Sequence, residues 1–396
     1  MTPPRISSRV SSLRPTVVNR ILSEVRAYQQ GGGQPISLMR GEPDLATPIH
    51  IVDAANRALA NGRTAYPNNQ GEPLLRQAIA RKLNRQQTGD YSPDEEVLIT
   101  TGATLGVYAA LAAVLDVGDE VLLPEPVYDA YLSVVLSLGG IARQIPAKID
   151  NGRFALAADD FASVCGSRTR AMLLNTPWNP TGTVLSRDEL ARLMSVAQQH
   201  DLVVISDEIY ESIVYPPHRS ISPVVLSDDA RQRTIIVNSF SKTYAMTGWR
   251  LGYCAGPAVL IRAMYLVLQQ SSRGPATFVQ DAGVEALDGP QDCVAEMQAI
   301  YSDRRQLVCD ALSPLPNVDV IVPEGGFFAM LDVRRIGLPS DEIRKRLLTE
   351  FGVVVVHGSA YGPSAEGTLR VTFATGGDNL KQGLERLSDG LAAIES

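Results

Sequence analysis

The chain has 396 residues, a formal net charge of −7, 20% charged and 45% hydrophobic residues, and a mean hydropathy near zero. A chain longer than about 250–300 residues outgrows a single hydrophobic core, so we expect two domains. The ordinary globular composition contains no long basic or acidic run and no apolar run approaching roughly 18 residues, which argues against nucleic-acid binding and against a membrane span.

The start of the chain is rich in arginine and serine. Arg5, Arg9, Arg14 and Arg20 all precede the first acidic residue. This pattern is typical of an organelle transit peptide or, alternatively, of an N-terminal arm of the mature protein. We favour the arm, because a functional-looking stretch follows closely from Ser37 onward, and we expect a cytoplasmic protein.

Cysteine and histidine are sparse and scattered. The four cysteines form no Cys-x-x-Cys pair, and no two of the four histidines have helical spacing. This distribution favours a reducing compartment without structural disulfides, and it predicts no metal site.

Hydrophobic periodicity predicts helices first and then an alternation of strands and helices. From residue 96 to 255, short apolar runs alternate with segments of helical spacing, which indicates a largely parallel sheet covered on both faces. Residues 258–312 read as helical with breaks at 274–275 and 289–290, and the chain after Pro316 reads as α+β. The expected helices are residues 17–30, 48–60, 72–84, 105–115, 128–138, 186–200, 340–351 and one from 379; the expected strands are 36–39, 96–100, 120–123, 170–174, 202–205, 234–237, 251–255, 318–322, 328–331, 353–356 and 368–373.

We therefore expect a large domain over residues 49–288. Residues 1–48 and 289–396 form the second unit, an N-terminal arm with a smaller C-terminal α+β domain. The helix from Ser186 begins with a capping box, Ser186 with Glu189 three residues later.

One lysine follows the strand 234–237 directly. Lys242 is preceded by Ser239 and Ser241 and followed by Arg250. The amine can form a Schiff base with a carbonyl, and the hydroxyls and the guanidinium can hold a phosphate. Taken alone, the pattern also fits a surface lysine after a strand. A carbonyl and a phosphate on one ligand describe pyridoxal 5′-phosphate.

Other polar residues follow predicted strands at the edge where open α/β sheets bind ligands. The turn Gly102-Ala103-Thr104 precedes a helix and could cradle a phosphate, or be a plain strand–helix turn. Four single residues also follow strands or begin helices, and each has a purely structural alternative. Asn179 could be a turn residue and Asp207 a helix cap or an exposed turn, and the two aromatics Tyr210 and Tyr128 could belong to the core. Together they suit one ligand: a carboxylate for a pyridine nitrogen, an amide and a phenol for the ring oxygen, and an aromatic for the ring face.

The chain resembles the class I/II family of pyridoxal-phosphate-dependent aminotransferases, of fold type I, over almost its whole length. The family's fold implies a large domain with a mostly parallel seven-stranded sheet plus a smaller α+β domain. The stretches that carry the resemblance are Gly41-Glu-Pro-Asp44, Tyr66, Thr101-Gly-Ala-Thr104, Gly118-Asp-Glu120, Asn179-Pro-Thr-Gly182, Ser206-Asp-Glu-Ile-Tyr210, Ser239-Phe-Ser-Lys242, Met246-Thr-Gly-Trp-Arg250 and Leu369-Arg370.

The resemblance implies a role for each of these positions. Catalysis is expected from Lys242, Asp207 and Tyr210, and the substrate carboxylate is expected at Arg370 with Asn179 and Gly41. Tyr66 would reach the cofactor of a neighbouring subunit, which implies a homodimer with shared active sites. The implied cofactor-binding residues are Gly102, Ala103, Thr104, Tyr128, Asn179, Asp207, Tyr210, Ser239, Ser241, Lys242 and Arg250, with Tyr66 from the partner.

The resemblance also implies the reaction. An amino group passes from an L-amino acid to the cofactor and then to a 2-oxo acid, so the kinetics are ping-pong. Another pyridoxal-phosphate reaction on the same scaffold, such as a β-lyase or an oxidase acting on an arginine-like amino acid, stays open, as does a protein that only holds the cofactor.

Two residues, Asp129 and Arg273, bear on which substrate side chains the protein accepts, and each has two interpretations. Asp129 departs from the usual uncharged residue at its position; it could favour a basic substrate or simply cap the following helix. Arg273 could bind a second carboxylate or be a solvated loop arginine.

Overall fold

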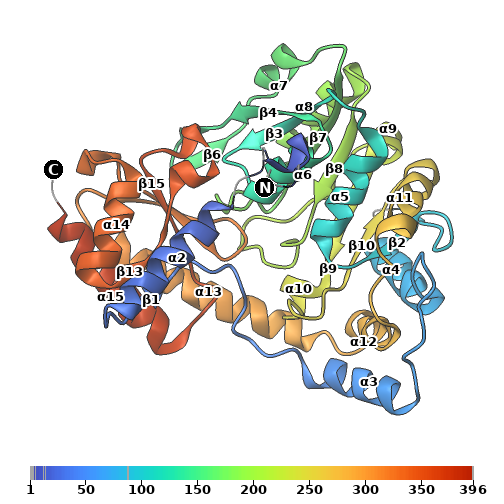
Figure 1. Cartoon of the computed structure of the whole chain (residues 1–396), viewed down its shortest axis with the longest axis horizontal. Helices are drawn as coiled ribbons and strands as arrows, with labels where there is room; N and C mark the ends of the chain where they lie inside the picture. Colours follow the sequence, from blue (N-terminus) through green and yellow to red (C-terminus); the bar gives the residue numbers. More distant parts are fainter. Residues whose placement is uncertain (1–3, 5, 12, 14, 87–88, 395–396) are drawn as a thin grey trace.

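Figure 1 shows the computed structural model of the chain, which describes residues 4, 6–11, 13, 15–86 and 89–394. Arg5 and Arg14 of the arginine-rich start lie outside the described residues. Within these ranges, no helix combines the length and the apolarity needed to cross a bilayer.

A seven-stranded sheet forms the centre of the larger part of the molecule. Only β10 runs antiparallel to its neighbours, so the prediction of a mostly parallel seven-stranded sheet is confirmed. In spatial order the strands are β2 (Val97–Thr100), β10 (Gly252–Ala255), β9 (Thr234–Ser239), β8 (Val203–Asp207), β7 (Thr169–Asn175), β3 (Glu120–Glu125) and β4 (Ile141–Pro146).

Both faces of this sheet are covered by helices, as the near-continuous apolar strands predict. Alternate strand residues enter opposite cores: Leu98 packs toward α5 and α11, whereas Val97 packs toward α4 and α12. The covering helices are α4 (Pro73–Arg85), α5 (Ala103–Val114), α6 (Asp129–Ser137), α8 (Arg187–Gln199), α11 (Ala258–Ser271) and α12 (Thr277–Asp288), and α3 (Ile49–Ala60) packs on α12. The capping box at Ser186 and Glu189 is formed.

A four-stranded antiparallel sheet forms a second core with the C-terminal helices (Figure 1). Its strand order is β11 (Asp319–Ile321), β12 (Phe328–Asp332), β15 (Thr368–Thr372) and β14 (Val356–His357). The helices beside it are α13 (Asp292–Leu312), α14 (Ser340–Phe351) and α15 (Gly377–Ala393).

The N-terminal segment packs on this second core. Its α2 (Val17–Gln30) lies against α14, and β1 (Ile36–Ser37) pairs in parallel with β13 (Val353–Val354). This agrees with the expected association of the arm with the C-terminal part, while the boundaries at residues 49 and 288 remain a prediction.

Several short elements were not predicted. Strand β4 was not predicted because it lies at the edge of the sheet and only one of its six residues, Ile145, is buried. A strand with so few buried side chains lacks the apolar run or alternation that indicates a strand in a sequence. The other additions are α1 (Ser8–Ser11), β5 (Lys148–Asp150), β6 (Arg153–Ala155), α7 (Ala158–Val164), α9 (Asp228–Arg233) and α10 (Phe240–Thr243).

Candidate active site

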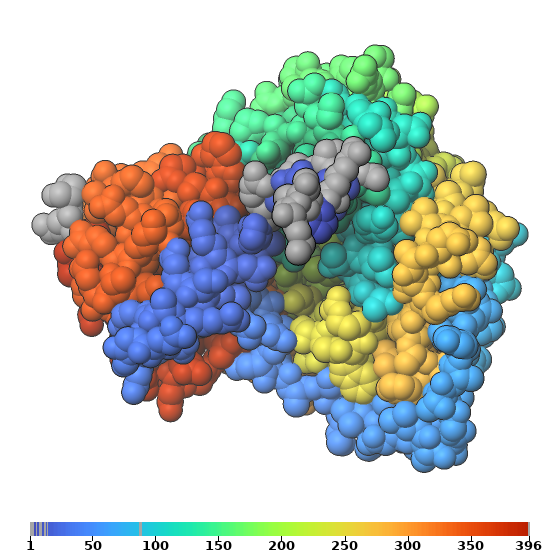
Figure 2. All heavy atoms as spheres, in the orientation of Figure 1, coloured from blue at the N-terminus to red at the C-terminus, as the bar shows by residue number. Residues whose placement is uncertain are grey.

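A cavity of about 480 Å³ lies at the carboxyl ends of β8 and β9, between the N-terminal segment, α5, α6 and α10. Figure 2 shows the surface hollowed at this place, between the blue N-terminal segment and the teal and yellow parts of the large sheet's side. Twelve predicted site residues line it: Gly41, Ala103, Thr104, Tyr128, Asn179, Asp207, Tyr210, Ser239, Ser241, Lys242, Arg250 and Arg370.

Two predicted residues do not line the cavity. Gly102 is the N-cap residue of α5, so it forms part of the turn before this helix without lining the cavity itself. Tyr66 is 90% exposed and does not line the cavity of its own chain, so its predicted contact with the cofactor of a neighbouring subunit stays a prediction.

Lys242 lies within the short helix α10 rather than on the strand itself. Its Nζ donates a hydrogen bond to the backbone oxygen of Gly41 at 2.8 Å. Burial lowers the pKa of Lys242 to about 8, and the nearby Arg250 and Arg370 act in the same direction against Glu42. The amine therefore reaches its neutral, nucleophilic form at a lower pH than an exposed lysine.

Asp207 ends β8 as a buried carboxylate. Its Oδ2 accepts a hydrogen bond from the Tyr131 hydroxyl at 2.6 Å, and its Oδ1 accepts one from the backbone N–H of Ile209 at 3.2 Å. Burial raises the pKa of Asp207 to about 6, although both hydrogen bonds and the charge of Lys242 oppose the rise. A buried carboxylate of this kind is suited to hold a positively charged ring nitrogen.

Sequence reasoning did not single out Tyr131. It stands one helical turn after Tyr128, and the two rings pack edge to face with centroids 5.3 Å apart. The spacing of three residues on α6 was the available signal, since residues i and i+3 share one helix face.

Asn179 is held by Asn175, a second residue that the sequence did not reveal. The Asn175 Oδ1 accepts from the backbone N–H of Asn179 at 2.8 Å, and its Nδ2 donates to the backbone oxygen of Asp207 at 3.0 Å. These bonds tie the Asn179 turn to the end of β8. The ring of Tyr210 is fixed nearby, edge-on to Phe327 and Phe328.

The donor groups for an anion gather at another end of the cavity. Ser239, Ser241 and Arg250 line it together with the first residues of α5, whose N-terminus has no side-chain cap. Uncapped helix N–H groups attract anions. Gly102 has φ +78°, and a Cβ there would lie 2.5 Å from Nη2 of Arg250, so only glycine allows the arginine this close to the turn. This donor set fits a phosphate.

Arg370 projects from β15 into the cavity. Its Nη1 donates to Oδ1 of Asn179 at 3.2 Å and its Nη2 to the backbone oxygen of Met39 at 2.7 Å. The guanidinium carbon lies 4.7 Å from the ring centre of Phe328 and 5.1 Å from that of Tyr361. Its Nε is buried without a protein partner. A fixed arginine with an unused donor is suited to a planar carboxylate.

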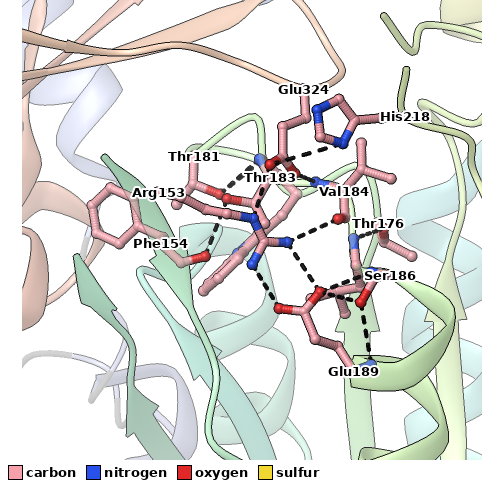
Figure 3. Close-up of polar contacts among 12 residues, drawn as sticks. Arg153, Phe154, Thr176, Thr181, Thr183, Val184, Ser186, Glu189, His218 and Glu324 are labelled. Carbon is pink, nitrogen blue, oxygen red and sulfur yellow. Dashed lines mark hydrogen bonds and ion pairs between the residues drawn. The ribbon is translucent and has the colours of Figure 1, made fainter. Parts of the chain in front are cut away.

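A cluster of charged residues connects the segment from Thr181 to Glu189 with Glu324, as Figure 3 shows. Arg153 donates from Nε to Oε1 of Glu324 at 2.8 Å, and from Nη1 and Nη2 to Glu189. The Oε2 of Glu324 accepts from the backbone N–H of Val184 at 2.8 Å, and the Glu324 N–H donates to the oxygen of Gly182. The turn that carries Asn179 and the loop that leads to Phe328 are thereby held together.

Asp129 is the first residue of α6 and lines the cavity. Burial raises the pKa of its carboxyl group, while Arg370 and the N–H groups of Asp129 and Ala130 oppose this. The side chain thus lies at the helix start and also faces the cavity. Arg273 is exposed and does not line the cavity of its own chain.

Comparisons with known proteins agree with this geometry. A sequence model of the family described as "Aminotransferase class I and II" matches residues 34–387. The chain is 37% identical to an aspartate aminotransferase of Pyrococcus abyssi over 384 residues (96% of this chain, 97% of the relative), and 35% identical to the aromatic-amino-acid aminotransferase 2 of Thermococcus litoralis over 384 residues (96% and 97%). The crystal structure of the aspartate aminotransferase of Rhizobium meliloti superposes with a TM-score of 0.95 at 34% identity, covering 99% of this chain and 100% of that one.

Proposed function

The chain belongs to the class I and II aminotransferase family, and we propose that the cavity lined by Lys242, Asp207 and Arg370 is its active site. The enzyme is a pyridoxal-phosphate-dependent aminotransferase that moves an amino group from an L-amino acid to a 2-oxo acid by a ping-pong mechanism. The observation that carries the site assignment is that these three side chains, from three distant segments, line one cavity.

The cavity residues divide into groups that fit the parts of the cofactor. Asp207 would hold the ring nitrogen and Tyr128 the ring face. Asn179 and Tyr210 would hold the phenolic oxygen. The phosphate would lie among Ser239, Ser241, Arg250, Gly102, Ala103 and Thr104. When bound, pyridoxal phosphate supplies a carbonyl that bonds to amines and a ring that accepts electrons.

Lys242 then acts as the base of the reaction. Its Nζ, whose pKa is lowered to about 8, takes the proton from the α-carbon of the amino acid. In the second half-reaction the protonated Nζ donates a proton to the α-carbon of the former oxo acid. Asp207, with a pKa of about 6, is largely ionised at neutral pH and stabilises positive charge on its partner.

Arg370 orients the substrate. We propose that the guanidinium binds the α-carboxylate through Nε, which has no protein partner, and through the remaining N–H groups of Nη1 and Nη2. Asn179 and Gly41 would lie beside the carboxylate. Because both substrates of the ping-pong cycle carry this carboxylate, one arginine serves both half-reactions.

Asp129 bears on side-chain choice. Its carboxylate lines the cavity with the apolar side chains of Val18, Met39 and Val134. We propose that it acts against substrates with a second carboxylate, since like charges in a partly buried site repel. The relatives include enzymes named for aspartate and for aromatic amino acids. Of these two kinds of substrate, Asp129 favours amino acids with an uncharged side chain, such as the aromatic ones.

We further propose that the enzyme works as a cytoplasmic homodimer. Tyr66 is 90% exposed, and Ile49 and Leu74 are 71% and 64% exposed, which supports an apolar contact with a second chain. The scattered cysteines, with no Cys-x-x-Cys pair, support a reducing compartment in this proposal. Lys242→Ala subunits should be inactive and Tyr66→Phe subunits impaired, and mixed dimers should regain one wild-type site, with higher activity than either parent, if Tyr66 serves the partner's cavity. Activity no higher than that of the Tyr66→Phe parent would count against shared sites.

The activity itself is tested by a half-reaction. The purified yellow enzyme is mixed with each of the twenty amino acids in turn, without oxo acid and under nitrogen. Loss of the visible band with release of one 2-oxo acid per site, and recovery of the band on adding a 2-oxo acid, is expected for the best donors. Ammonia release under nitrogen with the band retained would instead identify a lyase. Hydrogen peroxide release only when the same mixture is exposed to oxygen, which serves as the electron acceptor, would identify an oxidase.

A further inference from the structure

A second group of buried polar side chains lies against the start of α10 and has no part in the mechanism above. Lys82 of α4 forms an ion pair with Glu211, and its Nζ also donates to the Tyr253 hydroxyl at 2.8 Å. The side chains of Lys82 and Glu211 are only 14% and 11% exposed. Burial disfavours the charged amine, but attraction to Glu211 outweighs it and raises the pKa of Lys82 above its ordinary value.

Glu211 connects this pair to the end of β9. Its Oε1 accepts a hydrogen bond from Nδ2 of Asn238 at 2.9 Å. The Oδ1 of Asn238 in turn accepts from the backbone N–H of Ser239 at 2.7 Å. Ser239 then caps α10, since its Oγ accepts from the backbone N–H of Ser241 at 3.2 Å.

The charge of Glu211 fixes the direction of this chain of bonds. A carboxylate only accepts hydrogen bonds, so the amide group of Asn238 must turn its NH₂ toward Glu211 and its oxygen toward Ser239. Lys82 holds the Glu211 carboxylate in place through their ion pair. The backbone N–H of Ser239, which only donates, selects the same orientation from the other end, and a neutral side chain at position 211 would remove the selection that Glu211 adds.

Apolar packing alone does not hold this end of α10. A second cavity, of about 230 Å³, borders Ser239, Phe240 and Thr243 on one side and Lys82 and Glu211 on the other. Phe240 is buried and packs against Tyr253, but beside this space packing constrains the turn on one side only, so the hydrogen bonds add to what fixes its position.

We propose that Glu211, held by Lys82, is a positioning residue for the cofactor's phosphate. It acts through Asn238 on Ser239 and Ser241, the two hydroxyl residues that line the anion end of the active-site cavity. This inference rests on the proposed function, because it takes the anion at that end to be the phosphate of pyridoxal phosphate.

The test compares two ligands that differ only in the phosphate. The full-length apoprotein is titrated with pyridoxamine 5′-phosphate and with pyridoxamine, neither of which bonds to Lys242, and binding is followed by fluorescence. In Glu211→Gln we expect affinity for pyridoxamine 5′-phosphate to fall about tenfold and affinity for pyridoxamine to change less than twofold. Inorganic phosphate should compete about tenfold less well with pyridoxamine 5′-phosphate.

Glu208 provides a matched control. It is a buried carboxylate three residues earlier, and its Oε1 accepts hydrogen bonds from the hydroxyls of Ser206 and Ser222. Glu208→Gln should alter the two affinities alike. Equal losses for both ligands in Glu211→Gln, unchanged binding, or the same phosphate-selective loss in Glu208→Gln would overturn the positioning role.

A second variant guards against misfolding of the first. Asn238→Asp keeps an acceptor for the Ser239 N–H but sets a carboxylate against Glu211, so it should reproduce the phosphate-selective loss. Thermal unfolding of each apoprotein verifies that the chain is folded. Failure of the proposed function would look different: wild-type apoprotein would then show no preference for the phosphorylated ligand at all.

Discussion

Replacing Arg370 by alanine probes the proposed carboxylate site in free-energy terms. The guanidinium already donates to Asn179 and Met39, and its Nε is buried without a partner. A charge-assisted hydrogen bond contributes about 1.5–3 kcal/mol, so loss of a two-bond fork, less the cost of desolvation, is roughly 2–4 kcal/mol. At about 1.36 kcal/mol per factor of ten, kcat/KM for an amino acid should fall roughly 30- to 900-fold.

The assay compares an amino acid with the amine that has the same side chain but no carboxylate. Wild-type enzyme should strongly prefer the amino acid, and Arg370→Ala should lose most of this preference. Arg370→Lys keeps the charge but not the planar fork, so its loss should be intermediate. Cofactor affinity should change far less than kcat/KM in both variants, because Arg370 contacts the cofactor site only through Asn179. An alanine variant that retains the wild-type preference would refute the assignment of the carboxylate site.

Three further outcomes follow from the charges in the cavity. In the apoprotein, the rate at which acetic anhydride labels Lys242, followed by peptide mass spectrometry, should level off above about pH 8, because burial lowers the pKa to about 8; a rise continuing toward pH ~10.4, the ordinary lysine value, would contradict this. Tyr131→Phe removes a hydrogen bond to the Asp207 carboxylate, which raises the pKa of Asp207, so the acid limb of the kcat/KM profile should move to higher pH; an unmoved or lowered limb would count against the contact. Asp129→Asn should raise kcat/KM for aspartate relative to phenylalanine roughly tenfold. The carboxylates of Asp129 and of a substrate aspartate, taken to be about 8 Å apart at an effective dielectric constant of about 20, repel by about 2 kcal/mol, part of which is screened. An unchanged ratio would show that Asp129 does not take part in substrate choice.

Much of the site could be predicted because parallel strands end at one edge of a sheet. Asn179, Asp207 and Lys242 each follow an apolar run, so their convergence in space follows from the alternation of strands and helices. Arg370 comes from the other core, and only the family resemblance associated it with the rest. The structure brings it beside Asn179.

The supporting residues could not be predicted from the pattern. Tyr131 and Asn175 matter through hydrogen bonds to residues 76 and 32 positions away along the chain, and a local motif carries no trace of such contacts. Arg153 and Glu324 lie 171 residues apart and meet only because two loops pack together. The four-residue helix α10 is too short for hydrophobic periodicity to show. The pKa values of Lys242 and Asp207 depend on burial, which is likewise a property of the folded chain.

In the proposed active site, Lys242 holds the cofactor in the cavity that Asp207 and Arg370 also line. The most direct measurement is borohydride reduction of the yellow holoenzyme, which makes the bond between cofactor and lysine permanent, followed by proteolysis and mass spectrometry. We expect a single modified peptide that carries the cofactor on Lys242, and no modified peptide in Lys242→Ala. Cofactor attached to a different lysine, or modification that persists in Lys242→Ala, would contradict it.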